Sequence, residues 1–368
     1  MLAGTALQLH ATVAGDGRLH ATVRTLRPAA ARLLVGRRVD EAVALAPRLF
    51  ALCGCAQGAA ARLACRAAAG EAAALDEGDE RRLAAEAAHE HLWRLLLDWP
   101  VLFGAPPQRQ RYADLHRRLS IGPDATSAGA LGEELQRLAT DELLGGTLPR
   151  LQDAASLDAV HASLDAAGTG FARVLAQTIA LDTATDGAAT PVLPPRSAAA
   201  WATALGGLPD PHFCSAPTEG GNAAETGPLA RHAHLPVVAL LLARHRRIAA
   251  RLLAKVIDVA DCGARLAGAP GTPLADAIAP APGLGLACVD TARGTLLHGV
   301  RVEAGRIADY RICAPTDWHF HPGGAFVREA KGRHAADEAG TRLRLHALAL
   351  SLDPCVAFEL NVEDSVHA

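Results

Sequence analysis

Apolar and polar residues alternate in two short segments near the start of the chain. Every second residue of 7–13 is apolar, and the same alternation returns over residues 19–24. The glycine-containing sequence A-G-D-G, residues 14–17, separates the two segments. A period of two interrupted by such a turn is typical of a β-hairpin, so we predict two antiparallel strands here.

Helical patterning dominates the rest of the chain. We expect Gly70 and Pro354 to end two of the helices, and Trp99-Pro100 to end a third, because proline disfavours helix in the residue before it. The predicted helices span residues 28–47, 56–69, 80–98, 236–261 and 334–352.

Short strands return after the middle of the chain. Residues 284–290, 296–302 and 307–313 are apolar-rich runs separated by A-R-G and E-A-G turns. Residues 183–227 and 268–283, rich in Pro, Gly and Ala, are predicted to be irregular. The pattern predicts a helix-dominated α+β fold with small sheets near the N-terminus and in the C-terminal third.

Composition narrows the class of protein. The 368 residues are 50% hydrophobic and carry a net charge of −3, so the chain can bury a large core and shows no electrostatic footprint for nucleic acid. No uncharged apolar stretch approaches 18 residues, which predicts no membrane span, and the N-terminus lacks the features of a secretory signal. Eight scattered cysteines indicate reduced thiols in a cytoplasmic protein, some of them available to bind metal. The scarcity of lysine, found only at Lys255 and Lys331, is interpreted as a coding bias.

Two segments at opposite ends of the chain carry candidate chemistry. They are P-R-L-F-A-L-C-G-C-A-Q, residues 47–57, and S-L-D-P-C-V-A-F, residues 351–358. They resemble the signatures R-I-C-G-V-C-P-x-x-H and D-P-C-x-x-C of nickel–iron hydrogenase large subunits. In that family four thiolates hold nickel, and one cysteine of each pair also bridges to an iron that carries cyanide and carbon monoxide.

The resemblance leaves one thiol of each pair. In the first motif, Arg48 matches the family arginine and Cys53 the bridging cysteine, whereas Phe50 replaces a cysteine and Gln57 the histidine. In the second motif, Asp353, Pro354 and Cys355 match, whereas Phe358 replaces a cysteine. Other segments agree in order along the chain. Residues 290–298 and 314–322 resemble the strand and loop that surround the cyanides in the family, which implies a ligand pocket of Arg293, Pro315 and Thr316. The segment E-T-G-P-L-A-R, residues 225–231, also has a counterpart in the family. Asp16 occupies the position of the family's N-terminal glutamate.

The resemblance implies a single domain over residues 1–368, with irregular insertions at about 183–227 and 268–283. Four thiolates are expected for a stable nickel site, and two phenylalanines here remove ligands, so nickel binding is not expected. An iron that already carries three diatomic ligands needs fewer protein ligands. Cys53 and Cys355 are therefore the candidate metal ligands, although a free cysteine is also often a small buried hydrophobe.

The helix predicted after Cys53 should favour its thiolate. Cys55 is a further thiol that could replace a ligand, but a core position is favoured. Residues 86–91, E-A-A-H-E-H, are interpreted as a polar helix face, with a metal role as the minor alternative. Residues 244–247, R-H-R-R, are interpreted as a solvated helix face. His319 and His321 could bond diatomic ligands or a partner, or bond to backbone.

The resemblance to the accessory, HupK/HoxV branch of this family implies a non-catalytic scaffold. It would hold an Fe(CN)₂CO fragment transiently, receive it from a HypC/HypD-type carrier and pass it to the large subunit of an uptake hydrogenase. Two alternatives stay open: a divergent large subunit that binds nickel and oxidises hydrogen, and a quinone-site subunit like the complex I relative of this fold. The second alternative typically loses all four cysteines, whereas Cys53 and Cys355 remain here.

Overall fold

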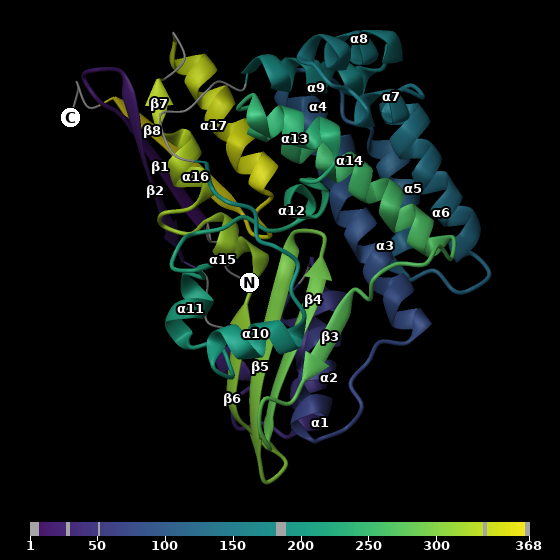
Figure 1. Ribbon diagram of the computed structural model, residues 1–368, viewed down its shortest axis with the longest axis vertical. Helices are drawn as coiled ribbons and strands as arrows, with labels where there is room; N and C mark the ends of the chain where they lie inside the picture. Colours follow the sequence, from purple (N-terminus) through teal and green to yellow (C-terminus); the bar gives the residue numbers. More distant parts are fainter. Residues whose placement is uncertain (1–6, 27–29, 51, 182–188, 334–336, 365–368) are drawn as a thin grey trace.

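The computed structural model describes residues 7–26, 30–50, 52–181, 189–333 and 337–364. The fold consists of two four-stranded sheets and a large helical body. The first sheet lies beside the helical body, and the second sheet extends away from it (Figure 1). The arrangement confirms a helix-dominated α+β fold. Within the described part no helix is long and apolar enough to cross a membrane.

The first sheet joins the two ends of the chain. Its strand order is β7-β2-β1-β8, with β1 (Leu7–Val13) antiparallel to β2 (Arg18–Thr25), as the alternating pattern predicts. The short β7 (Gly332–Arg333) extends the sheet beyond β2. The strand β8 (Phe358–Asp364) runs parallel to β1, with Leu7 opposite Phe358, and was not predicted. The pairing anchors the chain directly after Cys355.

The second sheet is an antiparallel meander in the order β3-β4-β5-β6. The strands β4 (Leu284–Thr291), β5 (Gly294–Glu303) and β6 (Arg306–Cys313) confirm the three predicted strands. The strand β3 (Ala275–Ile278) lies within a segment that was predicted to be irregular, so that prediction was wrong there. Helix α2 (Gly54–Ala68) packs against the sheet so closely that a Cβ at Gly285 would collide with the backbone oxygen of Ala64.

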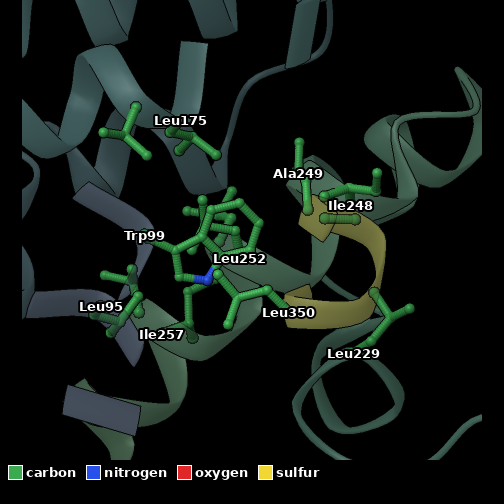
Figure 2. Packing of buried hydrophobic residues seen from close by; sticks show 14 of the residues in the cluster. Leu95, Trp99, Leu175, Leu229, Ile248, Ala249, Leu252, Ile257 and Leu350 are labelled. Atoms are coloured by element: carbon green, nitrogen blue, oxygen red, sulfur yellow. The ribbon is translucent and has the colours of Figure 1, made fainter. Parts of the chain in front are cut away.

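Helices supply most of the core. They are α1 (Val39–Leu45), α2 (Gly54–Ala68), α3 (Glu77–Trp93), α4 (Trp99–Leu102), α5 (Arg109–Ser120), α6 (Ala128–Arg137), α7 (Leu148–Gln152), α8 (Leu157–Ala167), α9 (Gly170–Leu181), α10 (Ala198–Leu205), α11 (Pro211–Ser215), α12 (Pro228–His232), α13 (Pro236–Ala243), α14 (Arg247–Leu266), α15 (Pro315–His319), α16 (Ala325–Ala330) and α17 (Glu338–Leu352). The long α14 contacts α3, α6, α9, α12 and α17. Trp99, Leu252, Ile257 and Leu350 lie in the core around it (Figure 2).

Several predicted helix boundaries were wrong for local reasons. The helix that includes α3 continues past Trp99-Pro100, because Arg94–Asp98 forms a π-helical turn in which the Trp99 N–H bonds to the Arg94 oxygen. Such a turn widens the helix, so the proline ring is accommodated. The segment 28–47 is interrupted at Gly36, whose φ of +81° is a left-handed conformation.

Two further segments differ from the predictions. The predicted helix 236–261 is split into α13 and α14 at His245, which has a φ of 56°. The segment 183–227 contains α10 and α11, so its described part is not wholly irregular. The helix α17 confirms the described part of the last predicted helix and ends just before Pro354, while residues 334–336 of that prediction lie outside the described residues.

Candidate functional site

Cys53 and Cys355 line one small pocket, although 302 positions separate them in the sequence. Cys53 immediately precedes α2, and Cys355 lies in the short link between α17 and β8. The pocket has a volume of about 30 Å³, and Arg293, Pro315 and Thr316 also line it. The structure therefore brings together both candidate ligands and all three residues of the expected ligand pocket.

Arg293 is buried between the pocket and the protein interior. Its Nε donates to the backbone oxygen of Asp353 at 3.0 Å, and its Nη1 pairs with Glu90. Its Nη2 is buried and has no hydrogen-bond partner among the described residues. A buried donor without a partner is costly, and Nη2 belongs to a side chain that lines the pocket. An acceptor bound in the pocket would satisfy this nitrogen.

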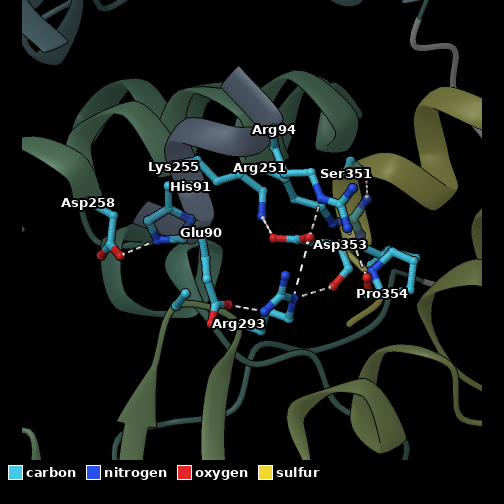
Figure 3. Close-up of polar contacts among 12 residues, drawn as sticks. Glu90, His91, Arg94, Arg251, Lys255, Asp258, Arg293, Ser351, Asp353 and Pro354 are labelled. Carbon is cyan, nitrogen blue, oxygen red and sulfur yellow. Dashed lines mark hydrogen bonds and ion pairs between the residues drawn. The ribbon is translucent and has the colours of Figure 1, made fainter. Parts of the chain in front are cut away.

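Asp353 joins the pocket to the helical body (Figure 3). Its carboxylate accepts from Arg94 at 2.6 Å and from Lys255 at 2.9 Å, and Arg94 also donates to the Pro354 oxygen at 2.9 Å. Burial alone would raise the pKa of Asp353, but Arg293, Lys255 and Arg94 hold it well below its usual range. Three cations thus fix the two residues that precede Cys355.

Arg94, Lys255 and Glu90 were missed as site residues. Lys255 is 2% exposed and bonds to Asp353, so this lysine has a structural role; the interpretation of the scarcity of lysine as a coding bias stays untested. The sequence did contain a signal for a buried Lys255, because this lysine lies between apolar residues on a strongly amphipathic helix. Nothing in the local sequence around Arg94 marks it as a partner of Asp353.

A chain of hydrogen bonds ends on the Cys53 sulfur. Gln57 Nε2 donates to Cys53 Sγ at 3.7 Å, and Gln57 Oε1 lies 2.9 Å from His298 Nε2. His298 Nδ1 in turn lies 2.8 Å from the Tyr310 hydroxyl. Because Gln57 Oε1 can only accept, His298 carries its proton on Nε2 and accepts from Tyr310. Gln57 therefore presents its amide to the sulfur in a fixed orientation.

The surroundings of Cys53 favour the thiol, although its place before α2 predicts a thiolate. Burial, together with the neighbouring Cys355 and Glu86, raises the pKa of Cys53 to about 12, against the lowering by Arg293 and Gln57. A bound cation would supply the positive charge that the thiolate needs.

Thr316 is the pocket residue in direct contact with Cys355, with 3.1 Å between Oγ1 and Sγ. The neighbouring histidines face other atoms. The ring nitrogens of His319 lie 2.8 Å from the Leu352 oxygen and 3.0 Å from the Thr226 oxygen. His321 Nδ1 accepts from the Gly323 N–H. Of the alternatives expected for these two histidines, the contacts fit hydrogen bonding to the backbone.

Three other candidate residues lie outside the pocket. Arg48 is exposed at the end of a short 3₁₀ turn. Asp16 is exposed in the turn of the β1–β2 hairpin and pairs with Arg18. Cys55 is exposed in a separate hollow that Arg62 and Arg82 also line. The structure gives none of the three a contact with either Cys53 or Cys355.

Residues 86–91 lie on α3, as the predicted polar helix face requires, but several of their side chains bond within the protein. Of residues 244–247, Arg244 and His245 are exposed, as predicted, whereas Arg247 is partly buried. In residues 86–91, Glu86 accepts from the N–H groups of Cys55 and Ala56 at 2.6 and 2.9 Å, and His91 lies 2.7 Å from buried Asp258. In residues 244–247, Arg247 pairs with Glu225 and Glu329, each at 2.9 Å.

The second-motif phenylalanine lies away from the thiols. Phe358 makes an edge-to-face contact with His346, with 5.4 Å between ring centroids, whereas Phe50 lines the pocket itself. Among the described residues no group of three or more His, Cys, Asp or Glu side chains is arranged to hold a metal ion. The pocket is lined by two sulfurs, the buried Arg293 guanidinium, the Gln57 amide and the hydroxyl residues Thr291 and Thr316.

The fold and the paired cysteine segments define the class of protein. The structure matches the nickel–iron–selenium hydrogenase of Desulfovibrio vulgaris Hildenborough with a TM-score of 0.61 and 14% sequence identity, over 96% of this chain and 100% of that chain. A second hydrogenase, from Desulfomicrobium baculatum, gives a TM-score of 0.61 over 92% of this chain and 94% of that chain, at 14% identity. The chain has the fold of a nickel–iron hydrogenase large subunit.

Relatives at higher identity define the branch of that class. The hydrogenase expression/formation protein HupK of Rhizobium leguminosarum is 36% identical over 92% of this chain and 90% of its own length. HoxV of Cupriavidus necator, with the same description, is 33% identical over 92% of this chain and 93% of its own. No protein-family model matches the chain. The chain belongs to the HupK/HoxV family of hydrogenase expression/formation proteins.

Proposed function

We propose that this protein is a non-catalytic scaffold in hydrogenase formation that holds an Fe(CN)₂CO fragment as cargo. In this proposal a HypC/HypD-type carrier delivers the fragment, and the protein passes it to the large subunit of an uptake hydrogenase. The names of the relatives support a role in hydrogenase formation. The eight thiols, none of them in a disulfide, suit the reducing cytoplasm, where we place the exchange.

The observation that carries the proposal is the unpartnered Arg293 Nη2 beside two thiols. A cyanide nitrogen bound to iron is a hydrogen-bond acceptor, and it would give this buried donor the partner it lacks. Soft thiolates suit the iron, and Cys53 and Cys355 supply one from each side of the pocket. The Thr316 hydroxyl, in contact with Cys355, is the candidate donor for the second cyanide.

The same pocket supports nickel chemistry poorly. Phe50 fills a position where a catalytic subunit would have a nickel ligand, and Phe358 lies against His346. Two sulfurs are fewer than the four that a nickel site of this type uses. This arrangement also disfavours the hydrogen-oxidising alternative, and the two retained thiols disfavour the quinone-site alternative.

The size of the pocket supports a transient hold. A void of about 30 Å³ takes one or two water molecules. The fragment is larger, so the pocket has to open for the cargo to enter and leave. Cys53 and Cys355 are both only partly buried, so the proposal puts this opening beside the two sulfurs.

Chemical analysis of the loaded protein tests the proposal. The protein would be purified from a host that expresses the carrier proteins, and its iron and cyanide content measured. We expect two cyanides per iron in the parent, and a loss of about tenfold or more in C53A and in C355A, which corresponds to about 1.4 kcal/mol of binding.

The matched control is C55A, because Cys55 lies in a separate hollow. It should keep the parent content of iron and cyanide. Equal losses in all three variants, or a parent protein that carries nickel without cyanide, would overturn the proposal.

A further inference from the structure

Two histidines and a tyrosine meet on the outer side of the helical body, away from any role in the thiol pocket. His89 comes from α3, and Tyr112 and His116 lie one turn apart on α5. His89 Nε2 lies 2.7 Å from His116 Nδ1 and 2.9 Å from the Tyr112 hydroxyl. Packing of α3 against α5 thus brings three polar atoms to one point.

These contacts cannot all be good hydrogen bonds. A ring nitrogen of a neutral imidazole has either one N–H or one lone pair, and it points in the plane of the ring. If His89 Nε2 accepts from His116, it has no lone pair for the Tyr112 hydroxyl. If it donates to His116, the hydroxyl can only share the same proton. The His89 Nε2 atom is therefore approached by both His116 and Tyr112, although it can form a good hydrogen bond with only one of them.

A cation at this point would satisfy all three atoms. Each imidazole would direct a lone pair at the ion, and the phenol oxygen would supply a third contact. Imidazole nitrogen suits the late first-row divalent ions, for which affinity rises from Co²⁺ to Cu²⁺. His116 is exposed and His89 half-buried, so water can reach the point and complete the coordination.

We propose that His89, His116 and Tyr112 form a binding site for one divalent late first-row transition-metal cation, of the Ni²⁺ to Zn²⁺ group. The site is distinct from the thiol pocket, because none of its residues lines that pocket. The inference does not depend on the proposed cargo. The site gives a role to His89. The other polar side chains of residues 86–91 bond to α2, Arg293 and Asp258.

Titration calorimetry with nickel chloride alone tests the site. The reduced protein would carry C53S and C355S, so that the pocket thiols do not compete for the metal. We expect one Ni²⁺ per chain, and binding weaker by about tenfold or more in H116A and in H89A. H234A, which removes an exposed histidine elsewhere, should bind as the parent does.

A second readout separates ligation from folding. His116 is exposed, so H116A should melt as the parent does while losing Ni²⁺. Electron paramagnetic resonance with Cu²⁺ as probe should show two coupled imidazole nitrogens in the parent and one in H116A. No stoichiometric binding by the parent, or Ni²⁺ and Cu²⁺ binding unchanged in both histidine variants, would overturn the proposal in favour of plain hydrogen bonds.

Discussion

Replacing Lys255 by methionine should destabilise the protein, whereas the same change at Lys331 should not. Lys255 is 2% exposed and donates to the Asp353 carboxylate at 2.9 Å, while Lys331 is exposed at the end of α16. These are the only two lysines in the chain, so each serves as a control for the other.

The expected loss of unfolding free energy depends on which charged groups each substitution leaves without a partner. In K255M the carboxylate keeps Arg94 and Arg293, so no buried charge is stranded, and the loss is one charge-assisted hydrogen bond of about 1.5–3 kcal/mol. In D353N the cations lose their shared partner, and removal of one member of a buried ion pair costs about 3–5 kcal/mol. K331M should stay within about 0.5 kcal/mol of the parent.

Reversible urea denaturation of the three variants measures these differences. The expected order of destabilisation is D353N, then K255M, then K331M. The double variant K255M/D353N should cost less than the sum of the single changes, because the two side chains contact each other. If K255M and K331M unfold at the same urea concentration, the argument that Asp353 is held by buried cations is wrong.

Three further results are expected. Burial alone would raise the pKa of Glu225, but Arg251 and Arg247 lower it to about 2, below the ordinary 4.5. Its stabilisation is therefore complete above pH 4.5 and lost as the pH falls toward 2; E225Q should flatten the dependence of stability on pH in that window. Y310F leaves buried His298 Nδ1 without its donor and should cost about 1–3 kcal/mol in urea denaturation. Deletion of residues 358–368 removes β8 from β1 and should lower the melting temperature, whereas the exposed-site variant E363Q should not.

Local patterns in the sequence were sufficient for much of the fold. The alternation in residues 7–13 and the strands after residue 284 depend on neighbours in the sequence and on burial of one face. The strand β8 had the same signal, since Phe358, Leu360 and Val362 alternate with polar residues. It was not predicted, and its parallel partner lies at the other end of the chain.

The candidate pocket could be located only because the two cysteine segments resemble a known pair. Spacing in the sequence does not show that residues 53 and 355 meet. The residues that support the pocket were harder to find, since Arg94 and Lys255 act across 259 and 98 positions on Asp353. Long-range ion pairs of this kind leave no periodic trace. The direction of the Cys53 pKa shift also needed the structure, because burial is its largest cause.

Infrared spectroscopy of the protein purified with its carriers tests the central claim most directly. Cyanide and carbon monoxide bound to iron absorb where the protein itself does not. The proposal predicts two cyanide bands and one carbon monoxide band in the parent, their absence in the C53S/C355S double variant, and shifted cyanide bands in R293K, which keeps the charge but lacks Nη2. A parent protein without these bands, or bands of equal strength in the double variant, would contradict the account.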